Sequence, residues 1–357
     1  MLLWQVIVKK YNLLGNNQIY DFFKGYKKYK ENYIKHRKPV VYFAGFPEHG
    51  NMGDQAIAAA MVSFVEKNFP EYYIHTIPLS SIIGNLLRIK RHIKKEDIFA
   101  LIGGGNMGDV YFDEEEARRI IIENFPHNKI IIFPQTIDYK DKSPEGELEK
   151  SIEIYKKHKN LCIFAREMFS YNLMKLYYPE NNVALCPDIV FSLNVNKLIR
   201  EKRETDKILL CIRKDKESAM PSDICIAISE MADKYKEKVI YTDTVLSGMP
   251  YIEKEDIRRT MVYRKLKEFA DAGIVITDRL HGMIFAAICH TPCIVIGNYN
   301  HKITSCYETW LSDANYIHML SKGENLMEIV KKLKQELPCT YKNWQECFGG
   351  ICKAWRK

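Results

Sequence analysis

The stretch VVYFAGFPEHGNMGDQAI, residues 40–57, predicts a strand, a turn with glycines and the start of a helix. Its apolar run Val40–Ala44 has the length and the β-branched and aromatic content of a buried strand. The pattern Gln55–Asn68 that follows has the period of a helix. A strand that leads directly into a helix predicts an α/β unit, in which helices cover a parallel sheet.

The same succession recurs along the chain. In the first half, further strands are predicted at Ile98–Ile102, Ile130–Phe133, Leu161–Phe164 and Val183–Leu185, with a helix at Glu114–Phe125. A polar, charge-rich stretch, Asn194–Lys207, is the predicted linker. The pattern then restarts, with strands at Ile208–Ile212, Lys238–Thr242, Gly273–Thr277 and Cys293–Ile296, and helices at Ser222–Lys236, Asp256–Asp271, Met283–His290 and Glu324–Leu337.

These patterns predict two doubly wound, Rossmann-like α/β domains that face a cleft. The expected domains are residues 1–195 and 205–337, and the pattern leaves the structure of a tail over 338–357 open. In such sheets ligands bind beyond the carboxyl ends of the strands. The residues that follow each strand are therefore the candidates for function.

The composition is that of an ordinary globular protein, with 357 residues of which 46% are hydrophobic and 27% are charged. It argues against collagen-like, coiled-coil and wholly disordered chains. The longest apolar runs, such as Met283–Cys289, fall far short of the ~20 residues that cross a bilayer. No basic region precedes the apolar residues Met1–Val8, so we expect no signal peptide and a cytoplasmic location.

The net charge is +8, which favours an acidic partner such as a phosphorylated metabolite, an anionic lipid or nucleic acid. Much of the excess lies in Lys24–Lys38, where cationic residues interleave with aromatic ones and Glu31 alone is acidic. A solvated helix face is the simplest interpretation, and a contact with an anionic membrane surface is the alternative. Nucleic acid is not expected, because no recognition motif accompanies the segment.

The ten cysteines form no Cys-x-x-Cys pair, and we expect them to be reduced and mostly buried. A disulfide framework would be typical of a small secreted domain instead. The chain shows no convincing metal-ligand spacing, so no metal site is predicted.

The first strand is followed by a turn that holds Gly50, Asn51, Gly53 and Asp54. Asn51 and Asp54 can cap the helix that follows. The turn can also bring backbone N–H groups and a helix N-terminus to an anion or a sugar. Taken alone, the sequence supports the capping role and the binding role equally.

The second predicted strand is followed by Gly103-Gly104-Gly105-Asn106-Met107-Gly108-Asp109. Three consecutive glycines are costly to order, so a close approach of the backbone to a ligand or to the first turn is the better explanation. The string Asn-Met-Gly-Asp occurs in both turns, which places Asp54 and Asp109 at equivalent positions. Either carboxylate could orient a sugar hydroxyl, act as a base or only cap a helix. A dinucleotide fingerprint is not favoured, because it belongs after the first strand.

Charged residues also follow later strands. Arg166 comes after Leu161–Phe164, Asp188 after Val183–Leu185, and Arg213 after Ile208–Ile212. An arginine at the carboxyl end of a strand suits a carboxylate or phosphate. For each one singly, a surface ion pair explains the residue as well.

The most informative element is Thr277-Asp278-Arg279-Leu280-His281-Gly282-Met283, at the junction of a predicted strand and helix. Arg279 and His281 lie near the helix N-terminus, where an anion is favoured. A lone histidine usually has a structural role. A histidine beside an arginine at such an edge is a candidate general acid/base.

Together these motifs resemble the polysaccharide pyruvyltransferase family, and in particular its bacterial exopolysaccharide, or biofilm-type, members. The resemblance covers about residues 40–300, and the set of motifs is specific although no single one is. The motifs that carry it are Gly50–Ile57, Gly103–Asp109, Ala165-Arg166-Glu167, Pro187-Asp188, Asp278–Met283 and Thr291-Pro292.

The resemblance implies a two-domain fold like that of GT-B glycosyltransferases. It implies transfer of the pyruvyl group of phosphoenolpyruvate to two hydroxyls of one sugar, which gives a pyruvate ketal and phosphate. Family members hold phosphoenolpyruvate near the motif that corresponds to Arg279, Leu280 and His281, with a second arginine that matches Arg166 or, as the alternative, Arg213. No further cofactor is required by the sequence. The implied partners are this donor and a saccharide acceptor, with a lipid-linked acceptor as one form.

Two other classes remain open. Many nucleotide-sugar glycosyltransferases of the same fold carry a pair of glutamates near the stretch Arg279–Pro292, which contains none. A non-catalytic component of a polysaccharide-synthesis complex would not need Arg279, His281 and both glycine-rich turns. The acceptor sugar, its bridged positions, its linkage and the oligomeric state leave no signature that we interpret.

Overall fold

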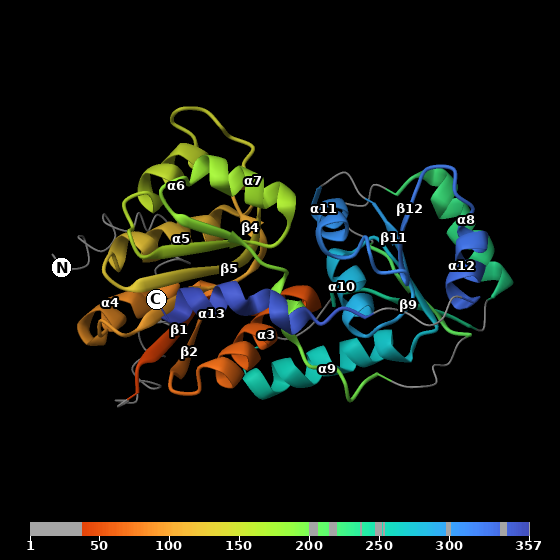
Figure 1. Cartoon of the computed structure of the whole chain (residues 1–357), viewed down its shortest axis with the longest axis horizontal. Helices are drawn as coiled ribbons and strands as arrows, with labels where there is room; N and C mark the ends of the chain where they lie inside the picture. The colour runs from red at the N-terminus through yellow and green to blue at the C-terminus, as the bar shows by residue number, and fades with distance from the viewer. Residues whose placement is uncertain are drawn as a thin grey trace.

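The computed structural model describes residues 38–199, 206–213, 220–235, 238–246, 252, 254–297, 301–335 and 341–356. These residues form two α/β units, one around each of two parallel sheets (Figure 1). The segment Lys24–Lys38 lies outside them except for Lys38, whose Nζ donates to the carbonyl of Pro70.

The first sheet holds seven of the described strands in the order β2-β1-β3-β5-β6-β7, and β4 pairs with β5. All of their pairings are parallel. The strands are β1 Val40–Phe46, β2 Tyr73–Pro78, β3 Ile98–Leu101, β4 Gly104–Met107, β5 Lys129–Ile137, β6 Leu161–Ala165 and β7 Asn182–Leu185. The helices of this unit are α3 Met52–Asn68, α4 Ile82–His92, α5 Phe112–Asn124, α6 Glu147–Tyr155 and α7 Met168–Tyr177.

The second sheet has the order β12-β11-β10-β8-β9 among the described strands, again with parallel pairings. The strands are β8 Ile208–Cys211, β9 Val239–Thr242, β10 Ile274–Thr277, β11 Cys293–Ile296 and β12 Ile317–Leu320. The helices are α8 Ser222–Lys234, α9 Glu255–Asp271, α10 Leu280–Ile288, α11 His301–Trp310 and α12 Leu326–Gln335. The prediction of an α/β fold with two parallel sheets is confirmed.

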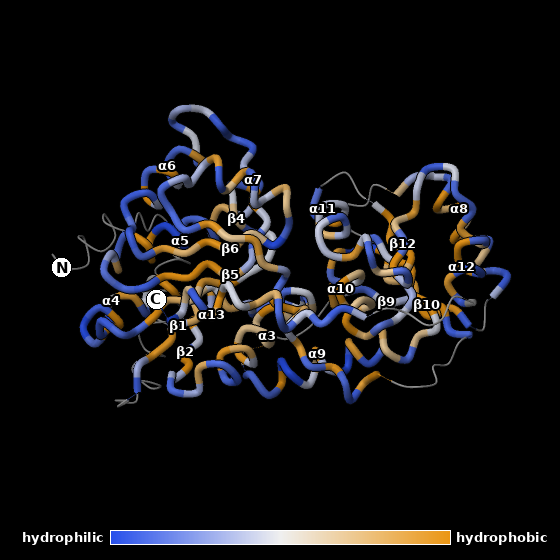
Figure 2. The backbone as a smooth tube through the Cα atoms, viewed as in Figure 1, coloured by the Kyte–Doolittle hydropathy of each residue, from blue (hydrophilic) through white to orange (hydrophobic). Residues whose placement is uncertain are grey.

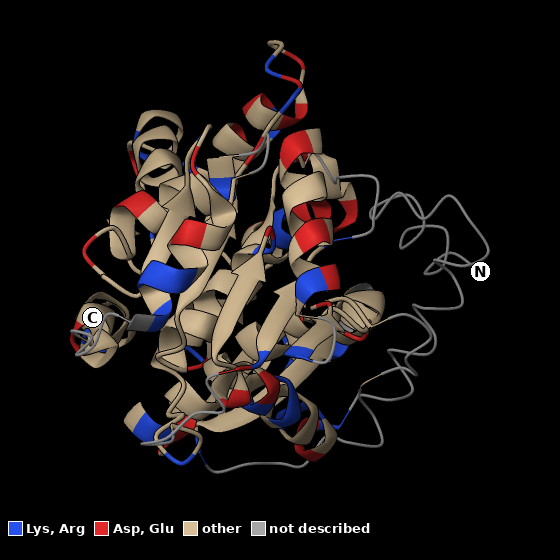
Figure 3. Cartoon of the chain, turned by 90° about the vertical axis from the view of Figure 1, so that its right-hand side faces the viewer, with Lys and Arg blue, Asp and Glu red and all other residues tan. Residues whose placement is uncertain are grey.

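The central strands are mostly apolar because helices cover both faces of each sheet. Figure 2 shows this arrangement, with apolar strands inside and more polar helix surfaces outside. Acidic and basic residues are interspersed along the helices and loops, as the colouring of Figure 3 shows. No described helix has both the length and the apolar character needed to cross a membrane. No disulfide joins the cysteines that the structure describes.

Two outer strands, β2 and β12, are not predicted from the sequence. They are short, and polar residues interrupt them, as His75 and Thr76 do in β2. The glycine segment expected to be a turn is also different, because Gly104–Met107 forms strand β4 beside the end of β5. Gly104 has φ +127°, a backbone conformation that other residues rarely adopt, and the glycine allows the chain to enter this strand.

The C-terminal segment returns to the first unit. It forms a 3₁₀ turn, Trp344–Phe348, and helix α13, Gly349–Arg356. The Trp355 ring stacks on Phe69 with centroids 4.6 Å apart, and Trp344 lies 4.2 Å from the ring of Phe191. Figure 1 shows α13 beside the first sheet although the second unit precedes it in the chain. The tail therefore completes the core of the first unit.

Helices of the two units meet on two sides. On one side, α9 lies along α3, where Arg259 Nη2 donates to Glu66 Oε2 at 2.8 Å (Figure 1). On the other side, α11 packs near the start of α7, where Ser305 Oγ donates to Glu167 Oε2 at 2.7 Å. These contacts orient the carboxyl ends of both sheets toward each other.

Candidate functional site

The turn before α3 is joined to the second unit. Asn51 caps α3, since its Oδ1 accepts from the N–H of Gly53 at 3.0 Å. The N–H of Met52 donates to the carbonyl of Thr244 at 2.7 Å, and the N–H of Leu246 donates to the carbonyl of Gly50 at 2.9 Å. The first glycine turn therefore lies against the loop that follows β9.

Gly53 is the point where His281 meets the first unit. A Cβ atom on Gly53 would overlap His281 Nδ1, so the lack of a side chain lets the imidazole lie on the first turn of α3. The neighbouring Asp54 is partly exposed, and its Oδ2 lies 3.8 Å from His49 Nε2. The sequence placed Gly53 and His281 in separate motifs, and the fold brings them into contact.

His281, Asp188 and Arg166 form a cluster at the junction of the units, in which Asp188 and Arg166 are buried and His281 is 12% exposed. His281 Nε2 lies 3.7 Å from Asp188 Oδ2, and Arg166 Nη1 donates to the same oxygen at 2.9 Å. Arg166 Nε donates to Thr136 Oγ1 at 2.7 Å, which fixes the plane of the guanidinium. His281 Nε2 is buried and has no hydrogen-bond partner among the described residues.

Burial opposes ionisation of Asp188, but the neighbouring His281 and Arg166 outweigh it and lower the pKa of the carboxyl to about 2. The N–H of Val190 also donates to Asp188 Oδ1 at 3.0 Å. Asp188 is thus a fixed negative charge beside the imidazole.

Arg279 is engaged within its own unit. Its Nε and Nη2 donate to the two carboxylate oxygens of Asp243 at 2.9 and 2.8 Å. Its N–H donates to Thr277 Oγ1 at 3.0 Å, which holds the turn into α10. Sequence reasoning missed Asp243, although it directly follows β9 and the rule of inspecting residues after strands would have found it.

Arg213 and Leu280 occupy supporting positions. The backbone N–H of Arg213 donates to Asp278 Oδ1 at 2.8 Å and joins the ends of β8 and β10. Burial raises the pKa of the Asp278 carboxyl, although this N–H and the nearby arginines act in the opposite direction. Leu280 begins α10 and packs partly against the core.

A second cation reaches the cluster from α11. A Cβ on Gly105 would lie 2.7 Å from Arg166 Nη2 and 3.2 Å from Lys302 Nζ. Lys302 Nζ donates to the carbonyl of Gly105 at 3.0 Å, across the junction of the units. Two cationic groups thus converge on β4, an arrangement that suits an anion. No sequence motif marks Lys302, and only the packing of α11 reveals it.

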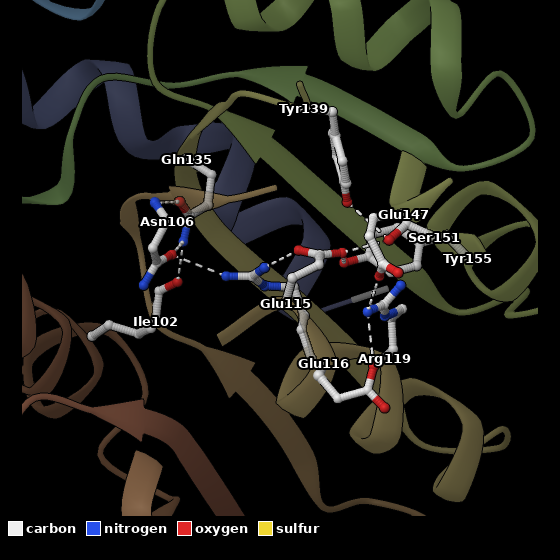
Figure 4. A network of polar contacts seen from close by, with 11 residues as sticks. Ile102, Asn106, Glu115, Glu116, Arg119, Gln135, Tyr139, Glu147, Ser151 and Tyr155 are labelled. Carbon is white, nitrogen blue, oxygen red and sulfur yellow. Dashed lines mark hydrogen bonds and ion pairs between the residues drawn. The ribbon is translucent and has the colours of Figure 1, made fainter. Parts of the chain in front are cut away.

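Of the other predicted residues, Asp109, Gly103 and Asn106 make contacts within the first unit. Both Asp109 carboxylate oxygens accept from the N–H of Lys140 at 2.9 Å, and Oδ2 accepts from the N–H of Asp141 at 2.6 Å. Asp109 thus stabilises the loop after β5 through backbone hydrogen bonds. Although Asp109 and Asp54 occupy equivalent positions in the repeated sequence string, their surroundings in the structure differ. Gly103 packs against the carbonyl of Pro134, and Asn106 belongs to a buried polar network (Figure 4).

The arrangement can bind an anion and move a proton. Arg166 and Lys302 supply positive charge, and His281 with ionised Asp188 supplies a group that can give and take a proton. The described residues contain no cluster of three or more His, Cys, Asp or Glu side chains suited to a metal ion.

The chain resembles known proteins in sequence and in fold. The family model described as polysaccharide pyruvyl transferase matches residues 51–301. General stress protein 30 of Bacillus subtilis (strain 168) is 36% identical over 308 residues, which cover 84% of this chain and 87% of that protein. Pyruvyl transferase 1 of Schizosaccharomyces pombe (strain 972) is 30% identical over 293 residues, 79% of this chain and 72% of that protein.

The fold itself matches a solved structure of Methanocaldococcus jannaschii UDP-GlcNAc 2-epimerase. The TM-score is 0.50 at 13% sequence identity, and the match covers 90% of this chain and 100% of the epimerase. At this identity the likeness shows the GT-B-like fold alone.

Proposed function

Because the chain belongs to the polysaccharide pyruvyl transferase family, we propose that it transfers the pyruvyl group of phosphoenolpyruvate to two hydroxyls of one sugar. The sugar belongs to an exopolysaccharide or its precursor, and the products are a cyclic pyruvate ketal and inorganic phosphate. The observation that carries the proposal is the cluster of His281, Asp188 and Arg166 at the junction of the units.

In the first half of the reaction, one sugar hydroxyl adds to C2 of phosphoenolpyruvate and a proton is delivered to C3. Protonated His281 is the donor, since its Nε2 carries no hydrogen bond within the described structure. Ionised Asp188 lies 3.7 Å from this nitrogen. The hydroxyl releases its own proton as the new C–O bond forms.

In the second half, the C–O bond to phosphate breaks and the phosphate leaves with the bonding electrons. The resulting carbocation-like centre is captured by the second hydroxyl of the same sugar. That hydroxyl gives its proton to His281, which was left neutral by the first half, so the acid/base group returns to its starting state. The proton of the first hydroxyl leaves with the phosphate.

The donor anion is held by cations from both units. Arg166 Nη2 and Lys302 Nζ both lie close to the Cβ position of Gly105. Arg166 is the better match for the second family arginine, and Arg213 is the alternative. Arg279 takes part while paired with Asp243, so the anion would share this guanidinium or displace the carboxylate. The acceptor lies along Asn51, Gly53 and Asp54 and the segment Gly103–Asn106.

The enzyme acts in the cytoplasm, and the segment Lys24–Lys38 brings it to the inner face of the membrane, where a lipid-linked acceptor would reside. The support is the local excess of positive charge interleaved with aromatic residues.

The test is release of phosphate from phosphoenolpyruvate in the presence of a panel of sugars and lipid-linked saccharides. The expected result is acceptor-dependent phosphate together with an acceptor that gains the mass of one pyruvyl group. Turnover of a nucleotide-sugar, with phosphoenolpyruvate inert toward every acceptor, would overturn the proposal.

A further inference from the structure

A buried ion pair on α5 connects the interior of the first unit to β4. Glu115 Oε2 and Arg118 Nη1 are paired, and their side chains are 1% and 3% exposed. Desolvating two charges is costly unless further hydrogen bonds compensate. Glu115 Oε1 accepts from Ser151 Oγ and from the Tyr155 hydroxyl, both at 2.8 Å (Figure 4). Burial raises the pKa of Tyr155 well above its ordinary value, so this hydroxyl remains a donor.

The other end of the guanidinium sets the orientation of Asn106. Arg118 Nη2 donates to Asn106 Oδ1 at 3.0 Å, and Gln135 Nε2 donates to the same oxygen at 2.8 Å. A carbonyl oxygen has two lone pairs, so these two donors saturate it. The amide therefore cannot turn over without placing its NH₂ group against two other donors.

The amide nitrogen of Asn106 is left to face outward from this network. Its Nδ2 forms no hydrogen bond within the described part of the chain, and the residue is partly exposed. Asn106 directly follows Gly105, whose carbonyl accepts from Lys302 and where a Cβ would lie 2.7 Å from Arg166 Nη2. An N–H donor of fixed direction thus lies one residue along β4 from the glycine whose carbonyl accepts from Lys302.

We propose that Asn106 Nδ2 donates a hydrogen bond to an oxygen of the bound substrate, and that Arg118, held by Glu115, is the positioning residue that fixes this amide. The inference rests on the proposed function, since the substrate is phosphoenolpyruvate or the acceptor sugar. Carboxylate, phosphate and hydroxyl oxygens all accept from an amide. The two sources separate by whether the KM for the donor or the KM for the sugar rises.

The test compares one change at two neighbouring arginines. Arg118→Lys keeps a positive charge beside Glu115 but loses the planar fork that reaches both Glu115 and Asn106. Arg119→Lys is the matched control, because Arg119 is equally buried on the same helix and pairs with Glu116 and Glu147 instead. We expect kcat/KM to fall about 10- to 100-fold in Arg118→Lys, the loss of one hydrogen bond to a charged or polar group. Arg119→Lys should change it less than about threefold.

A double-mutant cycle tests whether Arg118 affects catalysis through Asn106. Asn106→Ala should lower kcat/KM by a similar factor, and adding Arg118→Lys should then cost little, because Arg118 acts through Asn106. Additive losses would overturn the inference, as would equal losses in the two arginine variants at matched melting temperatures.

Failure of the proposed function would give a different experimental result from failure of this inference. A wild-type enzyme that transfers no pyruvyl group overturns that function and leaves the placement of Asn106 to be tested by crystal structures. Displacement of the Asn106 side chain in Arg118→Lys but not in Arg119→Lys supports the inference, and an unmoved side chain in both overturns it.

Discussion

His281 is the residue at which contributions from both units meet. It is the second residue of the second unit's helix α10, lies on the backbone of Gly53 in the first unit, and lies 3.7 Å from Asp188. Few side chains combine burial, a nearby fixed charge and an unpartnered nitrogen in this way, and such combinations are characteristic of acid/base groups.

We expect His281→Gln to lower kcat by roughly 10²–10⁴-fold with little change in the KM for phosphoenolpyruvate, because glutamine cannot deliver a proton to C3. Steady-state kinetics with both substrates varied would measure this. If His281 served only to neutralise phosphate, the same variant would mainly raise KM. Near-normal turnover in a folded variant would move the acid/base role to Asp54 or Asp188.

The contact between Gly53 and His281 leads to a second prediction about individual residues. In Gly53→Ala the new methyl group would overlap Nδ1, so the imidazole must move from its place beside Asp188. A displacement of about 1 Å can cost on the order of 10²-fold in rate, so we expect a loss of that size in kcat. Gly349→Ala, where no atom lies within 4 Å of the added carbon, is the control and should remain fully active.

The charge of Asp188 predicts a pH-dependent contribution to stability. Its pKa is lowered from 3.8 to about 2 in the folded state, so its stabilising effect is present above about pH 4 and is lost as the pH falls through 2. Asp188→Asn should therefore destabilise the protein by about 2 kcal/mol at pH 7 and by less at pH 3, as measured by urea unfolding. Asp256→Asn, at an exposed position of α9, is the control and should change the free energy of unfolding equally little at pH 7 and at pH 3.

Among the elements, α13 shows how a segment distant in sequence completes a core. Its Trp355 lies between Phe69 and Tyr72, and the Lys129 side chain donates to the Trp355 carbonyl at 2.8 Å. Strand β4 shows a similar dependence on its surroundings, because it forms only by pairing with β5, through Gly104 with Gln135 and Met107 with Ile137. The local sequence does not strongly predict either the helix α13 or the strand β4.

Trp355→Ala should lower the free energy of unfolding by about 3–5 kcal/mol, since it leaves a cavity against Phe69. Thermal or urea denaturation would measure the loss. Lys353→Ala on the exposed side of the same helix is the matched control and should fall within about 0.5 kcal/mol of wild type. Equal stabilities for the two variants would show that α13 does not contribute to the core.

At the scale of the whole molecule, the two units share one site. Ser305 reaches Glu167, Trp310 Nε1 donates to the carbonyl of Arg166, and Lys302 reaches Gly105, all from α11 to the first unit. The proposed donor site is therefore assembled from both units, and the relative placement of the units sets its geometry.

The proposed membrane contact is also a property of the whole molecule. Wild-type protein should co-sediment with anionic vesicles, less so at high salt, and less so when Lys27, Lys28 and Lys30 are changed to glutamate. Exposed basic residues contribute on the order of 1 kcal/mol each near such a surface. Equally weak binding to neutral and anionic vesicles would contradict this role, and the same substitutions at Lys331, Lys332 and Lys334 of α12 provide the control.

The sequence by itself determined the α/β class, the two parallel sheets and the family. These follow from local patterns: apolar runs that suit strands buried on both faces, helical periodicity, and glycine, arginine and histidine at strand ends. The positions of Gly53, Arg166, Asp188 and His281 near the carboxyl ends of strands were predictable for the same reason.

Only the tertiary structure decided which of these residues meet. It paired Arg279 with Asp243, placed His281 on Gly53, brought Lys302 to Gly105 and joined Asp109 to the backbone of the loop after β5. It also assigned the C-terminal helix to the first unit. Each of these contacts depends on how rigid helices and sheets pack at long range, and residues far apart in the chain carry no local pattern that specifies such packing.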